Sequence, residues 1–361
     1  MTNQEREFNL WAFGDAHVGT DIEYGRESLA EAIRHSEFGG SEGGSAFDWD
    51  IAIDAGDMSG THLGLPADEE GVEIRRQFSA MRKHRREDVY SVSGNHDRSG
   101  LTETAGWWWQ KWIDPLGLHT EHSGVDPAAR TYPVEGTWER YSFRVGNILF
   151  LMMSDINEPT QVVGRGDLGG NPGGVVSAET FDWWKRNVEA NPESIIITVH
   201  HYVLKDTTVA SGEWEGVRVA DDGSLHEHYH RPFQQGTPNG ASYLYWVGSK
   251  PDSGAFENYL EEHPGSVALW IAGHTHTHPD DSHGGKTHIE QRYGGTYFMN
   301  AASLSQHHMP ITTLPISRLL TFTPGSAEVR AQCYLHTSSH APQGFYEKAE
   351  CTMQLNKRFS W

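Results

Sequence analysis

The sequence predicts a layered α/β fold, and three observations support this prediction. Short apolar runs recur along the chain, and turn-forming or charged residues follow each of them, as is typical of buried strands. Segments with helical spacing of apolar residues lie between these runs, and strands that alternate with helices indicate α/β layers. Residues 296–329 are strand-like with little helical pattern, which predicts that this part completes a second sheet.

The predicted strands have continuous rather than alternating apolar residues, so we expect them to be buried on both faces. In chain order they span residues 8–13, 49–53, 89–92, 148–153, 195–199 and 267–271. The predicted helices span residues 26–36, 72–84 and 178–190. Ser177 is a suitable N-cap for the third helix, which has the clearest apolar spacing.

The chain of 361 residues is long enough for one large domain with insertions. We predict a domain over residues 1–335, with insertions at about 100–133 and 205–251, and a C-terminal segment, 336–361, whose role the sequence does not define. The first insertion contains a tryptophan cluster at residues 107–112. Its simplest interpretation is packing of a helix onto the core, and a pocket for a ring-bearing leaving group is the alternative.

The composition excludes several classes of function. Lys and Arg number 28 against 49 Asp and Glu, a formal net charge of −21, which disfavours binding to long nucleic acids or to anionic lipid. The two cysteines, Cys333 and Cys351, are too few for a disulfide framework or a four-thiolate zinc site. The sequence shows no secretory signal pattern and no apolar run long enough to span a bilayer, so we expect a cytoplasmic location without a membrane partner.

Polar side chains with metal-binding chemistry follow the predicted strands. Side chains at the carboxyl ends of strands in an α/β sheet can converge. The candidate ligands are Asp15, His17, Asp57, Asn95, His200, His274 and His276. This oxygen and nitrogen set suits Mn²⁺, Fe²⁺/Fe³⁺, Zn²⁺ or Co²⁺ rather than Cu(I) or an iron–sulfur cluster. Because seven ligands exceed one tetrahedral site, the set predicts two adjacent divalent or trivalent ions, of an identity that the sequence leaves open.

The order of these motifs resembles that of the calcineurin-like metallophosphoesterase family. The matching elements are Asp15-x-His17, Gly56-Asp57, Gly94-Asn95-His96-Asp97, His200 and Gly273-His274-x-His276. The resemblance covers about residues 8–325, and five elements in order are far more specific than any one of them. It implies a four-layer αββα sandwich, in which two mixed β-sheets are flanked by helices.

The resemblance also implies how the ligands divide between two ions. Asp15, His17 and His276 would bind one ion, Asn95, His200 and His274 would bind the other, and Asp57 would bridge them. A carboxylate suits the bridge because two cations held close together repel and need shared negative charge. Family members usually read His-x-Pro at the fourth motif, with the first histidine as ligand. This sequence has His200-His201-Tyr202, so we assign His200 as the ligand and His201 as a supporting residue near the substrate.

The remaining candidate residues concern the substrate. By resemblance, His96 would act as general acid or stabilise the transition state, and Asp97 would either orient the imidazole or only cap the following segment. Arg98 could contact phosphate through its planar guanidinium, a surface ion pair being the alternative. The pair His307-His308 lies close to the Asn300–Ser303 region in sequence and is expected to border the cleft, with His307 as the candidate substrate contact.

These observations predict a metal-dependent phosphoesterase that hydrolyses a small phosphodiester by in-line attack of a hydroxide bridging two metal ions. A phosphomonoesterase acting on a small or protein substrate is the nearest alternative. Hydrolysis of other esters or phosphotriesters at the same centre is another. From a different class, a metal-binding interaction scaffold that has lost catalysis also shares these motifs. The expected partner is a small phosphoester, and the sequence does not define the oligomeric state.

Overall fold

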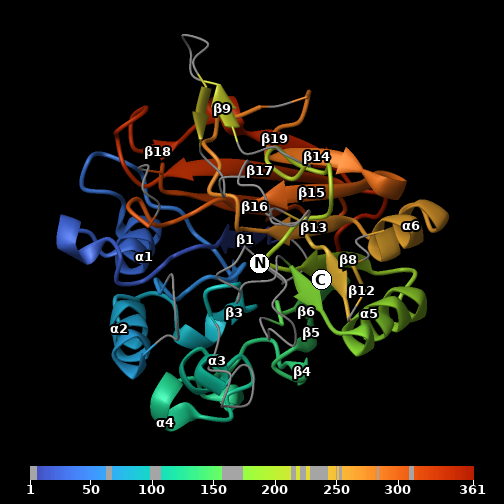
Figure 1. Cartoon of the computed structure of the whole chain (residues 1–361), viewed down its shortest axis with the longest axis horizontal. Coiled ribbons are helices and arrows are strands. Elements are labelled where there is room, and N and C mark those ends of the chain that lie inside the picture. The colour runs from blue at the N-terminus through green and yellow to red at the C-terminus, as the bar shows by residue number, and fades with distance from the viewer. Residues whose placement is uncertain are drawn as a thin grey trace.

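The computed structural model describes residues 6–61, 67–97, 107–156, 174–212, 217–219, 225–227, 243–248, 250–251, 254–282, 284–308 and 313–361. Two seven-stranded sheets lie at its centre, with helices outside each of them (Figure 1). The predicted four-layer αββα sandwich of two mixed sheets is therefore confirmed.

The first sheet has the strand order β18-β17-β16-β1-β2-β3, and β19 pairs with β17. Its parallel part, β1 to β3, supplies loops at one edge, whereas β16 and β17 run antiparallel. The strands are β1 (Phe8–Phe13), β2 (Ile51–Asp54), β3 (Val89–Ser91), β16 (Ile316–Phe322), β17 (Glu328–Leu335), β18 (Gly344–Phe345) and β19 (Cys351–Gln354).

The second sheet has the order β14-β15-β13-β8-β6-β5-β4, and β15, β13, β8 and β6 are parallel. Its strands are β4 (Glu135–Gly136), β5 (Arg140–Val145), β6 (Ile148–Met153), β8 (Ile195–Val199), β13 (Leu269–Ala272), β14 (Ile289–Arg292) and β15 (Thr296–Asn300). Short strands form two smaller sheets, namely β7 (Val175–Val176) with β11 (Trp246–Val247) and β12 (Lys250–Pro251), and β9 (Val217–Val219) with β10 (Leu225–Glu227).

Helices pack on the outer face of each sheet. On the first sheet lie α1 (Ser28–Phe38), α2 (Asp68–Phe78) and α3 (Trp107–Trp112), with α4 (Thr120–Ser123) beside α3. On the second lie α5 (Ala178–Ala190) and α6 (Gly254–Glu262). Ser177 caps α5 as predicted, because its side chain accepts the N–H of Thr180. Short 3₁₀ turns span Ile22–Tyr24, Arg86–Asp88, Pro127–Ala129, Tyr293–Gly295 and Glu347–Ala349.

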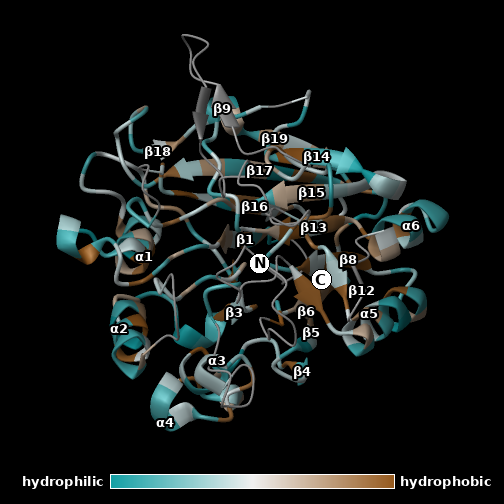
Figure 2. Ribbon diagram, viewed as in Figure 1, coloured by the Kyte–Doolittle hydropathy of each residue, from teal (hydrophilic) through white to brown (hydrophobic). Residues whose placement is uncertain are grey.

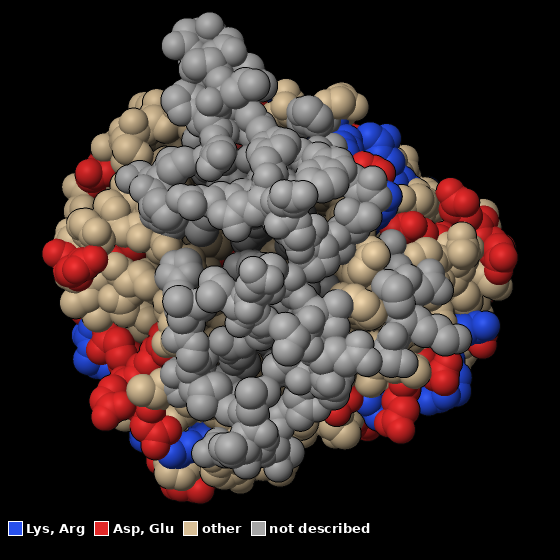
Figure 3. All heavy atoms as spheres, viewed as in Figure 1, with Lys and Arg blue, Asp and Glu red and all other residues tan. Residues whose placement is uncertain are grey.

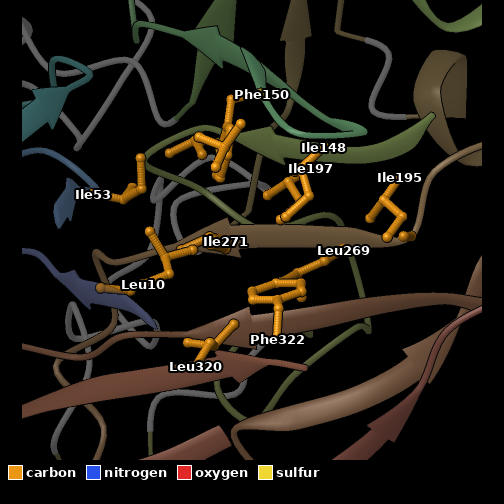
Figure 4. Packing of buried hydrophobic residues seen from close by; sticks show 14 of the residues in the cluster. Leu10, Ile53, Ile148, Phe150, Ile195, Ile197, Leu269, Ile271, Leu320 and Phe322 are labelled. Carbon is orange, nitrogen blue, oxygen red and sulfur yellow. The ribbon is translucent and has the colours of Figure 1, made fainter. Parts of the chain in front are cut away.

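The main core lies between the two sheets. Apolar side chains from both inner faces interdigitate there, among them Leu10, Ile53, Phe150, Ile197 and Leu320 (Figure 4). Apolar residues also occupy the outer faces of the central strands, which pack under the helices. The ribbon of β6 is coloured as hydrophobic in Figure 2. This burial on two faces explains why the strands read as continuous apolar runs in the sequence.

Two expectations about organisation change. Residues 296–329 do not complete one sheet: β15 joins the second sheet, whereas β16 and the start of β17 join the first. Residues 336–361 are not a separate extension, since β18 and β19 pair with β17 and Met353, Leu355 and Phe359 enter the main core. The sequence did not indicate that this segment joins the first sheet, because β19 is short and partly exposed.

The tryptophan cluster packs as its simplest interpretation predicts, with Trp108, Trp109 and Trp112 of α3 buried against the first sheet. Most of the 205–251 insertion, including its histidines' side chains, lies outside the described residues. On the surface, acidic side chains are distributed around the face drawn in Figure 3, with basic ones among them. Within the described ranges, each helix is too short or too polar to cross a membrane.

Candidate metal centre

Loops from both sheets meet at one edge of the sandwich. Three of them follow the parallel strands β1, β2 and β3, and two follow β8 and β13. They bring together side chains that are at most 6 % exposed, namely Asp15, His17, Asp57, Asn95, His96, His201, His274 and His276. Burial of so many polar groups in one place indicates a built site rather than a solvated surface.

A first group of ligand atoms consists of Asp15, His17 and His276. Asp15 Oδ1 lies 2.9 Å from His276 Nε2 and 3.7 Å from His17 Nε2. The two imidazole Nε2 atoms are 3.1 Å apart. The other oxygen, Asp15 Oδ2, accepts the backbone N–H of His274 at 2.8 Å, which ties the loop of the first sheet to the loop of the second.

A second group consists of Asp57, His201 and His274. Asp57 Oδ2 lies 3.1 Å from His201 Nε2. Asn95 joins this group, because its Oδ1 lies 3.2 Å from the same His201 nitrogen and accepts the Tyr202 hydroxyl at 2.9 Å. The structure thus brings together two of the three residues predicted for the second ion, Asn95 and His274, with the predicted bridge Asp57.

Asp57 Oδ2 lies between the two groups. Besides the contact with His201, it is 4.0 Å from His17 Nε2 and 3.9 Å from His96 Nε2. Asp57 Oδ1 accepts the backbone N–H of His96 at 2.8 Å. This is the position that a bridging carboxylate requires.

Backbone carbonyls fix the orientation of two imidazoles of the ligand groups. Nδ1 of His17 contacts Ser59 O at 2.8 Å, and Nδ1 of His201 contacts Ala55 O at 2.8 Å. Since a carbonyl only accepts, each Nδ1 must carry a proton and donate it. Each ring then presents Nε2 to the centre, the usual arrangement for a metal-binding histidine. The donor set of carboxylate, amide and imidazole, held in this way, fits borderline divalent cations.

The backbone of the ligands is itself unusual. Five of them have positive φ: Asp15 (52°), His17 (39°), Asp57 (59°), His274 (72°) and His276 (44°). Non-glycine residues rarely adopt this left-handed conformation, which costs about 1–2 kcal/mol per residue. Its concentration at one place is typical of a functional site.

Two glycines of the motifs are needed for close approach. A Cβ on Gly94 would lie 2.2 Å from Asp57 Oδ1, and a Cβ on Gly273 would lie 2.2 Å from Asp15 Oδ2. Both oxygens belong to the clustered carboxylates. The glycine before Asn95 and the glycine before His274 therefore leave the space that these carboxylates occupy.

The charges in the centre are strongly coupled. Burial raises the pKa of Asp57, but nearby imidazoles, His201 first and then His96, outweigh this effect and hold it well below its usual range. Burial lowers the pKa of His201, but the charges of Asp57 and Asp15 outweigh it and raise the value to about 10. Without a cation, the His201 imidazolium thus offsets part of the negative charge of Asp57 and Asp15.

The structure places His201, rather than the predicted ligand His200, beside Asp57, His274 and Asn95. Residues 195, 197 and 199 of β8 face the core between the sheets, whereas residues 196 and 198 face α5 and the outer layer. Pairing with the β13 segment continues past the strand, through His200 N to Ile271 O and Gly273 N to His201 O. The alternation therefore continues too, so His201 points to the centre and His200 away from it. His200 is buried beside the Tyr202 backbone, and burial lowers its pKa to about 3.

Asp97 has a different role from the predicted one. Its carboxylate accepts the backbone N–H groups of Asp57 (2.8 Å), Ser59 (2.9 Å) and Gly94 (2.8 Å). It thus shapes the loop that carries the Asp57 ligand. The His96 imidazole is oriented instead by the Thr61 carbonyl, 2.7 Å from Nδ1, a contact with backbone that no residue pattern shows.

Of the predicted substrate contacts, His307 lies apart from the cluster and Arg98 lies outside the described residues. His307 stacks on Tyr24, with ring centroids 4.0 Å apart. Its neighbour His308, the other histidine of the pair expected at the border of the cleft, is buried in the site. It stacks on His17 at 3.4 Å and meets His96 edge-on at 4.8 Å. The pair His307-His308 was the available signal, but loop residues have no periodicity that separates them.

Comparisons with known proteins give fold-level likeness alone. No family model matches the chain, and no curated protein matches its sequence. Solved structures that align with the chain include a single mutant of Vps29 from Entamoeba histolytica (12% identity, 96% of this chain and 99% of that chain, TM-score 0.33). Another is the sulfate thiohydrolase SoxB of Thermus thermophilus in complex with glycerol (12% identity, 94% and 58%, TM-score 0.40). A third is Vps29 of Cryptosporidium parvum (12% identity, 98% and 99%, TM-score 0.30). At these values, the chemistry has to be assigned from the side chains of this centre.

The adjacent histidines provide a first test. His201→Ala should lower the affinity for Mn²⁺ by at least about 10- to 100-fold, because it removes a nitrogen beside Asp57 Oδ2. His200→Ala is the matched control and should leave the affinity within about twofold, since its ring faces away. Calorimetric titration of both variants with Mn²⁺ makes the comparison. A larger loss in His200→Ala than in His201→Ala would restore the original assignment.

The coupled charges provide a second test. The affinity of the chain for Mn²⁺ should decrease as the pH is lowered. The proton on His201, whose pKa is about 10, must leave before a cation binds, so affinity should rise about tenfold per pH unit from pH 6 to 9 for each proton released. Calorimetric titrations with Mn²⁺ in buffers of different ionisation enthalpy measure the number of protons released on binding. An affinity that does not change with pH, with no proton released, would contradict the coupling.

Proposed function

We propose that this chain is a metal-dependent phosphoesterase of the calcineurin-like type, acting on a small phosphodiester. The observation that carries the proposal is the position of Asp57 Oδ2, between a group of Asp15, His17 and His276 and a group of His201, His274 and Asn95. One carboxylate shared by two sets of ligands is the arrangement that supports a dinuclear centre.

The residues of this chain would place two cations close together and keep them there. When bound, such a pair lowers the pKa of a water molecule and neutralises the charge on phosphoryl oxygens. Asp57 reduces the repulsion between the cations, and the carbonyls of Ser59 and Ala55 hold His17 and His201 in the tautomer that leaves Nε2 for a cation.

His96 is suited to assist the leaving group. Its Nδ1 is anchored on the Thr61 carbonyl, and its Nε2 faces the centre, 3.9 Å from Asp57 Oδ2. A proton on Nε2 would be stabilised by this carboxylate and transferred to the departing oxygen. His308 packs edge-on against the same ring and restricts its rotation.

The central experiment joins metal content to substrate choice. The native chain should contain about two transition-metal ions and hydrolyse bis(p-nitrophenyl) phosphate faster than p-nitrophenyl phosphate. Asp57→Asn should fold normally and lose at least about 10³-fold in kcat, because the shared negative charge is gone. Asp48→Asn, an exposed aspartate on the approach to β2, is the matched control and should keep full activity.

Each other outcome has a defined meaning. A preference for p-nitrophenyl phosphate would make the enzyme a phosphomonoesterase. Two bound metal ions without turnover of either compound would favour the inactive scaffold. Full activity in Asp57→Asn, or at most one ion after reconstitution, would refute the shared-carboxylate centre.

The role of His96 predicts a dependence on the leaving group. His96→Asn should lower kcat about 10²- to 10⁴-fold for a phosphodiester that releases phenol, and much less for one that releases p-nitrophenol, because the better leaving group needs no proton. His307→Asn is the control and should behave like the native chain. Equal losses for both leaving groups would show that His96 does not act as the general acid.

A further inference from the structure

A second site of unusual chemistry lies away from the metal centre, around Arg318 of β16. This side chain is 1 % exposed and lies among the largest fully buried groups of the protein. Its Nη1 donates to Ala349 O at 3.0 Å. Nε and Nη2 are buried and have no hydrogen-bond partner among the described residues.

The placement of Arg318 follows from strand alternation. Leu320 and Phe322, two and four residues further along β16, lie in the core between the sheets, so Arg318 also points inward. On the neighbouring strands its Cα partners are Ala12 and Cys333, which offer no counter-charge. A guanidinium cannot lose its charge in a protein, and an unpaired buried charge is costly.

Arg318 is one of the residues that line a cavity of about 430 Å³. The loop Pro279–Ser282, strand β14 and the segment from Lys348 to Cys351 form its walls. Lys348 adds a second positive charge, and Ile289 and Ala349 add apolar surface. None of the metal-centre residues named above lines this cavity.

The acidic residues of the cavity wall already have partners. Both oxygens of Asp280 accept the Tyr346 hydroxyl, at 2.8 and 3.0 Å. Glu350 forms a two-point pair with Arg330, at 2.6 and 2.8 Å. Asp281 accepts the backbone N–H of His278 at 2.7 Å. Within the described residues, Arg318 has no carboxylate within 4.0 Å.

We propose that this cavity binds a small anion through a carboxylate or phosphate group that pairs with Arg318. Nε–H and Nη2–H lie on one edge of the guanidinium and point in parallel, which matches two oxygens of such a group. Both atoms are closed off from solvent in this structure, so the proposal includes a displacement of the cavity wall beside Arg318 when the anion binds. Lys348 contributes at the rim. The apolar wall accepts the uncharged part of a small organic anion, and the loop Pro279–Ser282, which begins three residues after the His276 ligand, connects this site to the metal centre along the chain.

The experiment separates this site from the metal centre. In Asp57→Asn, prepared without added metal, inorganic phosphate or acetate should raise the Tm by several degrees at saturation. Adding Arg318→Met should abolish the response to both anions. Adding Arg144→Gln, which removes an exposed arginine on β5, should leave it intact. Arg318→Met fills the same volume, so it should fold and have a Tm at least as high as its parent in anion-free buffer.

A second measurement keeps the test valid if Asp57→Asn unfolds. Calorimetric titration of the otherwise native chain with phosphate should show one binding site fewer in Arg318→Met, while hydrolysis of bis(p-nitrophenyl) phosphate is unchanged. A response to acetate alone would identify a carboxylate ligand, and one to phosphate alone a phosphate ligand. An unchanged anion response in Arg318→Met, or the absence of any response in its parent and in the native chain, would overturn the proposal.

Discussion

The carboxylate of Asp57 is the point on which the geometry of the centre depends. It comes from the loop after β2 in one sheet, yet its closest imidazole, His201, follows β8 in the other sheet. The contact between Asp57 and His201 therefore joins the two sheets, and the core between the sheets sets the distance between these two side chains. A well-packed core resists small displacements, so the side chains between the sheets define the distance between the ligand groups.

Support for this carboxylate comes mainly from backbone atoms. Asp97 collects three N–H groups around the loop, and carbonyls of Ala55, Ser59 and Thr61 orient three imidazoles. Each of these carbonyls lies within the same loop after β2. A single short loop thus carries the shared carboxylate of Asp57 and also fixes the imidazole rings around it. Gly94 packs against this loop at Asp57, and a side chain at position 94 would collide with the Asp57 carboxylate.

The sequence predicted the layers well because the central strands are buried on both faces. Residues 8–13, 148–153 and 195–199 match β1, β6 and β8, where continuous apolar runs end abruptly. The second strand begins later than predicted, since Trp49 packs in the outer core before the strand starts. Residues 351–354 were missed because β19 exposes alternate side chains at a sheet edge, where the apolar signal is weak.

For the site, the motifs predicted the ligand loops but not every ligand. His201 could have been found by extending the alternation of β8 by two residues, a purely geometric signal. The role of Asp97 could not, because a set of backbone N–H groups leaves no periodic pattern. The sequence indicated the pair His307-His308 but not which of the two rings enters the site, because a loop has no fixed alternation. The sequence also did not single out Arg318. A charged residue in an apolar strand can be recognised as unpaired only when its neighbours in the fold are known.

The left-handed backbone of the five ligands has a consequence for the evolution of this protein. Glycine is the residue that tolerates such a conformation best, so at each of these positions the side chain that chemistry requires is not the one that the free chain prefers. Selection for thermostability alone, in the laboratory or in nature, would favour replacement of these very residues. Under the proposed function, each of these five side chains therefore contributes to the metal centre and, through its backbone conformation, lowers the stability of the fold.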